Sequence, residues 1–199
     1  MYKDKPANVQ IRGLYAPGFS SLMMSYFNTN LVLGFNPYIG KDNIGLSQYC
    51  NKSFQSTSIN PERAAFLYMQ ASRILDCRHS GEQVETVIPC NNGASLTFEY
   101  KPDENDQMSA FITINKNNVD IPFKFKTTEY QENVGGQWVK KYMHTGLGTF
   151  ALILGCYLAG KAANSHIDEL YNEALEMAHE QDRQEYEQEV FNATMNNNQ

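Results

Sequence analysis

Lysine side chains alternate with aromatic rings in one short segment of the chain. In Phe123-Lys124-Phe125-Lys126 the two rings would face one side and the two ammonium groups the other, because successive side chains of a strand point in opposite directions. Aromatic rings stack on nucleobases, and ammonium groups neutralise phosphates. The segment therefore predicts a sheet whose outer face is cationic and suited to a base-bearing anion.

Two further segments combine the same residue types. If extended, residues 137–143 place Trp138, Lys140 and Tyr142 on one side, and residues 38–54 offer a similar mixture of rings and lysines. Strands are often aromatic and lysines are common on solvated faces, so a nucleic-acid-binding protein and a generic interaction module fit these residues equally well. The candidate nucleic-acid-binding residues are Tyr38, Lys41, Tyr49, Lys52, Phe54, Lys124, Lys126, Trp138, Lys140, Lys141 and Tyr142.

Catalytic and metal-binding patterns are weak by comparison. The four histidines and four cysteines have none of the spacings typical of zinc sites or of hydrolase motifs. Residues 155–161 match the phosphate-loop pattern G-x-x-x-x-G-K, but Ala162 stands where a Ser or Thr hydroxyl would hold magnesium. We therefore expect a protein that is not an enzyme and needs neither a cofactor nor a metal.

Charge is unevenly distributed along the 199 residues. Residues 166–199 contain nine acids and one base, a net of −8, whereas residues 1–165 carry +2 within a total of −6. This predicts two regions, a nucleic-acid-binding domain at 1–165 and an acidic C-terminal helix and tail at 166–199. Such a tail competes with an anion for the basic surface, recruits a protein partner, or only keeps the chain soluble.

The elements that would position these residues form a repeated pattern. A block of strand-like segments precedes an apolar helix-like segment from about residue 19 to 75, and again from about 96 to 163. We therefore expect an α+β fold of two antiparallel β-sheets, each followed by a helix, as a duplicated unit. Residues 145–160 lack charges but are too short for a bilayer span, and no signal peptide precedes the domain. An intracellular protein without a membrane partner is expected.

Short strings within both units resemble the Whirly family of single-stranded DNA-binding proteins. They are residues 30–40 and 48–58 with a helix from Pro61, then residues 110–115 and 121–124 with a helix over 147–159. The chain lacks that family's Lys-Gly-Lys-Ala-Ala-Leu string. The resemblance implies subunits that meet through their helices as a homo-oligomer, a tetramer in that family, with DNA crossing the sheet faces. Bacteriophage single-stranded DNA-binding proteins and kinetoplastid guide-RNA-binding proteins share this layout.

Together these features predict a single-stranded DNA-binding protein of DNA replication, recombination or repair, with a bacteriophage origin as one alternative. An RNA-binding or RNA-annealing protein on the same fold is a second hypothesis. A third is a non-enzymatic structural or assembly protein, such as a virion component, with the tail as a docking peptide. The first hypothesis predicts that replacing Lys124 and Lys126 weakens binding and flattens its salt dependence.

Overall fold

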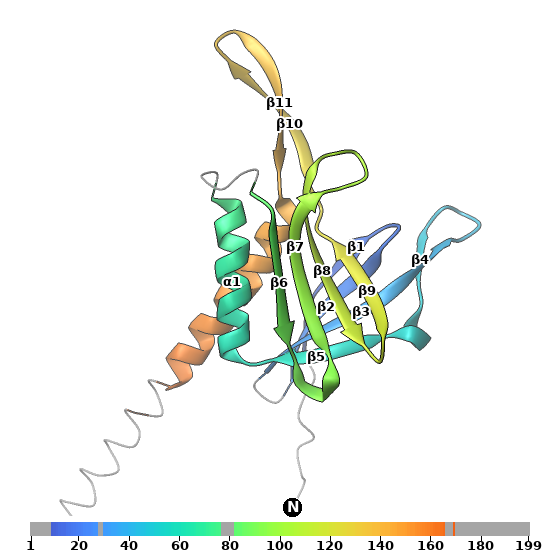
Figure 1. Cartoon of the computed structure of the whole chain (residues 1–199), viewed down its shortest axis with the longest axis vertical. Coiled ribbons are helices and arrows are strands. Elements are labelled where there is room, and N and C mark those ends of the chain that lie inside the picture. Colours follow the sequence, from blue (N-terminus) through green and yellow to red (C-terminus); the bar gives the residue numbers. More distant parts are fainter. Residues whose placement is uncertain (1–8, 28–29, 77–81, 166–168, 170–199) are drawn as a thin grey trace, which may run out of the picture. The chain divides into compact units, whose positions relative to one another are not determined.

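The computed structural model describes residues 9–27, 30–76, 82–165 and 169. By its internal contacts the chain divides into two compact units, Met1–Leu158 and Ala159–Gln199. The first unit is an α+β structure of antiparallel sheets and helices, as the sequence predicts (Figure 1). The predicted acidic tail lies outside the described residues apart from Glu169.

The first sheet has five antiparallel strands. They are β1 (Val9–Ala16), β2 (Ser20–Phe27), β3 (Asn30–Lys41), β4 (Ser47–Tyr49) and β5 (Gln55–Ile59), with β3 paired to β2, β4 and β5. Alternation along β3 buries Leu31, Leu33 and Phe35 on the inner face and leaves Val32 and Asn36 on the outer one. A short 3-10 turn, η1 (Asn51–Ser53), connects β4 to β5.

The second sheet has four antiparallel strands in sequential order. They are β6 (Val84–Pro89), β7 (Ser95–Pro102), β8 (Met108–Lys116) and β9 (Val119–Lys124), with the turn η3 (Asn91–Gly93) between the first two. Phe98, Ile112 and Phe123 are opposite one another in the register and are buried on the inner face. The core between the two sheets is continuous, and Ser20 in β2 donates a hydrogen bond to the Pro122 carbonyl in β9 at 2.7 Å.

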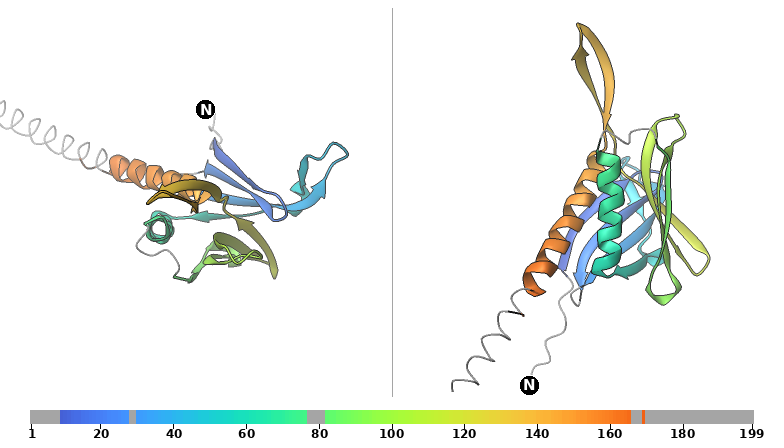
Figure 2. Two further views of the ribbon diagram at one scale, coloured as in Figure 1. Left: turned by 90° about the horizontal axis from the view of Figure 1, so that it is seen from above. Right: turned by 60° about the vertical axis from the view of Figure 1, so that its left-hand side comes forward.

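Two helices lie beside the sheets. In α1 (Pro61–Leu75) the Asn60 side chain caps the first turn and Pro61 occupies its start, which is a favourable N-terminal arrangement. The second helix, Thr145–Ser165, runs five residues beyond the uncharged segment that the sequence suggested. With 21 residues it is long and apolar enough to cross a membrane by length and composition, a test that buried core helices also pass. In the first unit its residues Leu147, Phe150 and Leu154 are buried in the core. The two helices pack side by side, and the Tyr68 ring lies close to Gly155 (Figures 1 and 2).

A separate hairpin projects from the first unit. Its strands are β10 (Thr128–Val134) and β11 (Gln137–Met143), joined by Gly135 and Gly136, both with positive φ, as a two-residue type I′ turn requires. Every residue of both strands is exposed. A two-stranded hairpin of this kind is marginally stable by itself in water.

Several sequence-based expectations about individual elements were accurate. A helix begins at Pro61, and residues 30–40 and 110–115 lie within β3 and β8. The extended segment expected to run through Lys126 stops earlier, because β9 ends at Lys124. The first sheet begins earlier than expected, however, because β1 was not predicted. The hairpin was not predicted either.

Candidate nucleic-acid interface

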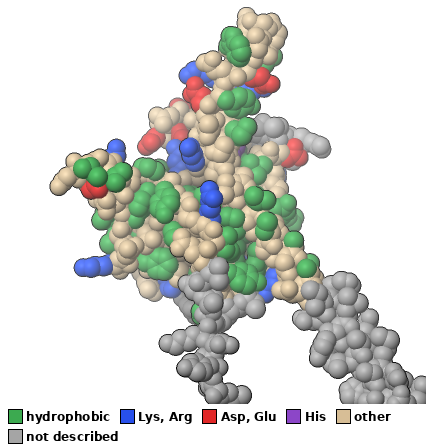
Figure 3. All heavy atoms as spheres, turned by 180° about the vertical axis from the view of Figure 1, so that it is seen from behind, with side chains coloured by type: hydrophobic (Ala, Val, Ile, Leu, Met, Phe, Trp, Pro, Cys, Tyr) green, Lys and Arg blue, Asp and Glu red, His purple; other side chains and the backbone are tan. Residues whose placement is uncertain are grey.

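Four aromatic side chains gather on the outer face of the first sheet. The ring centroids of Tyr15 and Tyr49 are 5.7 Å apart, and those of Tyr38 and Tyr49 are 5.9 Å apart. Phe54 follows η1, and its side chain lies against the same face at Gly34. We call this the aromatic face; Tyr15 is 61% exposed and Phe54 45%. Hydrophobic side chains gather on the side of the molecule seen in Figure 3.

The absence of a side chain at Gly34 makes room for the Phe54 ring on the sheet. A Cβ atom built on Gly34 would lie 2.5 Å from the tip of the Phe54 ring. Gly34 does not have a positive φ, so the requirement here is for space and not for a special backbone conformation. The ring can therefore lie directly against the backbone of β3, as a flat and partly exposed surface.

Tyr49 occupies the middle of the tyrosine group. Burial raises the pKa of its hydroxyl, and the hydroxyl oxygen has no hydrogen-bond partner among the described residues. The ring therefore stays neutral across the physiological range. A neutral ring can approach a phosphate-bearing strand without charge repulsion.

Cationic side chains lie at the margins of the aromatic face. Lys41 ends β3, Lys52 lies in η1, and both are exposed. Lys126 follows β9 and lines two neighbouring hollows together with Tyr15, one of which also includes Arg12. Within the described part of the chain, none of these four side chains has a carboxylate partner. They are therefore available to phosphates.

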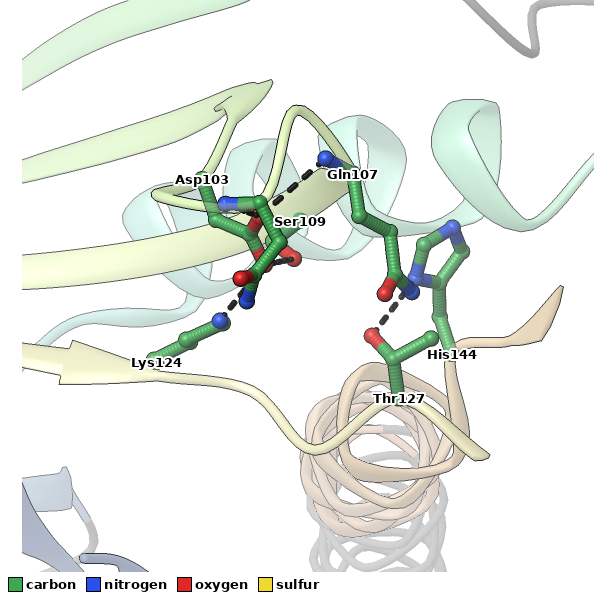
Figure 4. A network of polar contacts seen from close by, with 7 residues as sticks. Asp103, Gln107, Ser109, Lys124, Thr127 and His144 are labelled. Atoms are coloured by element: carbon green, nitrogen blue, oxygen red, sulfur yellow. Dashed lines mark hydrogen bonds and ion pairs between the residues drawn. The ribbon is translucent and has the colours of Figure 1, made fainter. Parts of the chain in front are cut away.

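Lys124 behaves differently from its neighbour Lys126. Its Nζ lies 2.6 Å from Oδ2 of Asp103, whose side chain is only 4% exposed, and Ser109 donates to the same oxygen (Figure 4). The ammonium group also lies 6.0 Å from the centre of the Phe111 ring. The expected alternation is confirmed, since Phe123 and Phe125 are buried. Lys124, however, is paired with Asp103 and is not a free cation.

Asp103 is held in its charged form by this network. Burial by itself would raise its pKa, but hydrogen bonds outweigh this effect and lower the pKa from 3.8 to about 2. The donors are Lys124, the backbone amides of Asn105 and Gln107, and Ser109. The loop between β7 and β8 is thus a hairpin loop, and its first carboxylate anchors it to β9.

His144 links the hairpin to the second sheet. One ring nitrogen lies 3.0 Å from the Tyr100 hydroxyl. The other lies 3.3 Å from the Thr127 hydroxyl (Figure 4). Burial lowers its pKa, so the imidazole is neutral near pH 7. Both ring nitrogens are thus engaged in hydrogen bonds with hydroxyl groups of the protein itself.

Four predicted residues, Trp138, Lys140, Lys141 and Tyr142, lie on strand β11 of the hairpin and not on the aromatic face. Trp138, Lys140 and Tyr142 do share one side of β11, as the register with β10 shows, and Trp138 is 70% exposed. Lys140 lies 2.9 Å from Glu129, whose carboxylate raises the pKa of the lysine, and Lys141 pairs with Glu132. The hairpin is therefore aromatic but has no net charge.

The structure brings together only part of the predicted set. Tyr38, Tyr49 and Phe54 form one surface with Lys41 and Lys52 at its margin. Tyr15, the most exposed ring of that surface, was missed. Its signal in the sequence is the alternation of Gly13 and Tyr15 with Leu14 and Ala16, directly before a Pro-Gly turn.

The two sheets also differ in charge. Residues 9–59 contain three bases and one acid, Asp42, a net of +2. Asp42 accepts hydrogen bonds from its own loop, at the backbone amides of Ile44 and Leu46. Residues 84–124 contain three bases and six acids, a net of −3, and Glu85 and Glu99 are directly opposite each other on the outer face. Of these two stretches, the one that forms the first sheet is therefore the one with a net positive charge.

Comparison with known proteins finds no matching family model, no matching curated protein and no matching solved structure. Function has therefore to be inferred from the residues and geometry of this chain. Among the described residues no group of three or more His, Cys, Asp or Glu side chains is placed to hold a metal ion.

Proposed function

We propose that this protein binds single-stranded DNA through the aromatic face of the first sheet, in replication, recombination or repair. The observation that carries the proposal is the cluster of Tyr15, Tyr38, Tyr49 and Phe54 on a sheet with a net positive charge. Stacking on such rings contributes about 1–3 kcal/mol per base and tolerates any sequence. The lysines at the margin attract the phosphates.

The order of elements supports a Whirly-like architecture for this function. Strands β1 to β5 precede α1, and strands β6 to β9 precede the helix Thr145–Ser165, with the hairpin inserted before it. We interpret this order as two copies of one strand-and-helix unit. The second copy then serves mainly as a scaffold, because its outer face is acidic.

Self-association through the helices belongs to the same proposal. Phe66 and Met69 of α1 and Leu152 of the second helix are exposed apolar side chains, although each helix already packs one side into the core. Exposed apolar helix surfaces of this kind are typical of subunit interfaces. We expect a homo-oligomer, a tetramer by analogy with the Whirly family, and light scattering at micromolar concentration tests it; a monomer mass would contradict it.

Fluorescence anisotropy with a labelled oligothymidylate tests the binding function directly. We expect binding that weakens as salt increases, and weaker binding of a matched duplex, whose bases cannot stack on the face. A ribose version of the same oligonucleotide separates DNA from RNA binding, because a reader of the 2′-hydroxyl prefers RNA. Absence of binding at low salt by folded protein would refute the proposal.

A role in assembly is the second candidate, and the hairpin is the observation that favours it. Its strands expose Tyr130, Trp138 and Val139 without net charge, which suits a protein surface better than a polyanion. Deleting residues 128–143 and joining the ends with a short glycine linker separates the two roles. If the protein binds single strands through the first sheet, its affinity for oligothymidylate should be unchanged by this deletion. A purely structural protein should bind oligothymidylate neither before nor after the deletion.

A further inference from the structure

A hollow of about 470 Å³ lies on the outer side of the first sheet, next to Phe54. Its lining differs from that of the tyrosine group, because it combines two apolar side chains with three amides and a hydroxyl. The lining residues are Gln10, Met23, Ser25, Asn36, Asn51 and Phe54. The space is large enough for one nucleobase.

The amide side chains make this hollow different from a simple stacking surface. An Asn or Gln amide presents one donor and one acceptor side by side, which is the pattern needed to pair with the edge of a base. The three amides come from β1, β3 and η1, so the sheet brings together residues that are far apart in the sequence. A stacking surface without such groups would accept all bases equally.

Asn36 has an unused acceptor. Its Nδ2 donates to the Ser21 hydroxyl at 3.3 Å, while its Oδ1 is buried and has no hydrogen-bond partner among the described residues. A buried acceptor without a donor is unfavourable. Rotation of the amide toward the hollow would let a ligand that brings an N–H group satisfy this oxygen.

Phe54 closes one side of the hollow and is held flat by Gly34 beneath it. A base that enters would stack on this ring, and its edge would then meet the amides. We propose that the hollow binds one nucleobase and prefers a base with an exocyclic amine, which adenine, cytosine and guanine have, over thymine, which lacks one. The preference arises because the amine brings a donor to the Asn36 oxygen, whereas thymine flanks its single ring N–H with two carbonyls. This inference rests on the proposed function.

Anisotropy competition tests the base preference. The probes are an oligothymidylate and two versions of it in which one central thymidine is replaced by deoxyadenosine or deoxycytidine. Because an amide that pairs with the correct base discriminates by about fivefold or more, the substituted oligonucleotides should bind at least that much more tightly. The salt dependence should be the same for all three, since the phosphates do not change.

Variants locate the preference in the hollow. Asn36→Ala should bring the affinity ratio close to one, and Asn51→Ala, at an exposed position that does not endanger folding, should reduce it. Asn43→Ala, an exposed asparagine of the β3–β4 loop, is the matched control and should keep the wild-type ratio. In all three variants the salt dependence should stay unchanged.

The outcomes separate this inference from the binding function. Binding of all three oligonucleotides with equal affinity, a preference for thymine, or a ratio that survives both Asn36→Ala and Asn51→Ala would overturn the base site and leave strand binding intact. Failure of the folded wild-type protein to bind any oligonucleotide would overturn the proposed function and the base site together.

Discussion

The outer faces of the two sheets have the same kind of backbone and opposite chemistry. On the first sheet, the rings of Tyr15 and Phe54 lie exposed and those of Tyr38 and Tyr49 are half-buried. Asp42, the one acid among residues 9–59, accepts hydrogen bonds from its own loop. On the second sheet the ring of Phe111 is buried beneath Lys101 and Lys124, and each of these lysines is neutralised by a carboxylate. The same residue types thus form a binding surface in one place and a closed, stabilising network in the other.

The comparison shows that lysine and aromatic content alone does not identify a nucleic-acid surface. What matters is whether each cation has a partner and whether each ring is exposed. A paired lysine has already lost most of its attraction for a phosphate, because the carboxylate next to it would be repelled by the same phosphate.

Removing the rings of the first sheet should have the largest effect on binding. Since each stacked base contributes about 1–3 kcal/mol, the triple variant Tyr15→Ala, Tyr49→Ala, Phe54→Ala should bind oligothymidylate at least about a hundredfold more weakly. Anisotropy titration measures the loss, and circular dichroism checks the fold. The matched control on the second sheet is Val87→Ala with Thr97→Ala, which should bind like the wild type. An equal loss of affinity in both variants would show that the outer faces of the two sheets do not differ in binding.

Removing the unpaired cations should change the salt dependence. Each lost phosphate contact lowers the slope of log K against log salt by about 0.7 for single strands, so Lys41→Ala, Lys52→Ala and Lys126→Ala together should lower it by about 2. The control is Lys101→Ala with Lys124→Gln, which removes two paired lysines of the second sheet. A slope that falls equally in the control would show that the ion pairs open on binding.

The Asp103 network should affect stability and not binding. Because the pKa of Asp103 is lower in the folded protein than its usual value of 3.8, its stabilising contribution is complete above that value and is lost as pH falls toward about 2. We expect Asp103→Asn to lower the free energy of unfolding by up to about 2 kcal/mol at pH 7.

Urea unfolding of the wild type and Asp103→Asn at pH 7, 4 and 2 measures this contribution. The difference between them should persist at pH 4 and shrink at pH 2, and the affinity for oligothymidylate at pH 7 should be the same. A clear loss of affinity would instead make the second sheet part of the binding surface.

Deleting residues 179–199 should have the smallest effect, and it concerns residues outside those described. The deletion removes five acidic side chains and one arginine. If the tail competes with DNA for the first sheet, the shortened chain should bind a few-fold more tightly at low salt. The difference should fade as salt rises, because screening acts over about 10 Å at 0.1 M. Unchanged low-salt affinity would favour a docking or solubilising tail.

The sequence predicts the local parts of this structure well. Alternation in Phe123-Lys124-Phe125 correctly gives the buried side of β9, and Pro61 correctly marks the start of α1. These features depend on the local geometry of a strand or a helix, and a few consecutive residues of the sequence are enough to predict them. The pairing of Lys124 with Asp103 is not visible in this way, because 21 residues separate them and the contact depends on how β7, β8 and β9 align.

The same reasoning explains the errors at the candidate site. Tyr15 lies in an edge strand that is short of apolar residues, with Arg12 and Gly13 interrupting the pattern, so its strand was not recognised. Gly135-Gly136 is a strong hairpin signal, but the sequence does not reveal that the lysines of β11 lie close to Glu129 and Glu132. Exposure and pairing are properties of the assembled sheets.

Gly34 has a consequence for how the chain can vary. The Phe54 ring tip is the group that a Cβ at position 34 would meet, and an exposed ring can swing aside at little cost. Gly34→Ala should therefore leave the protein folded while removing the ring from its resting position, and once position 54 is small the same substitution should have no effect. Positions 34 and 54 are thus coupled, because the effect of a side chain at 34 depends on the presence of the ring at 54.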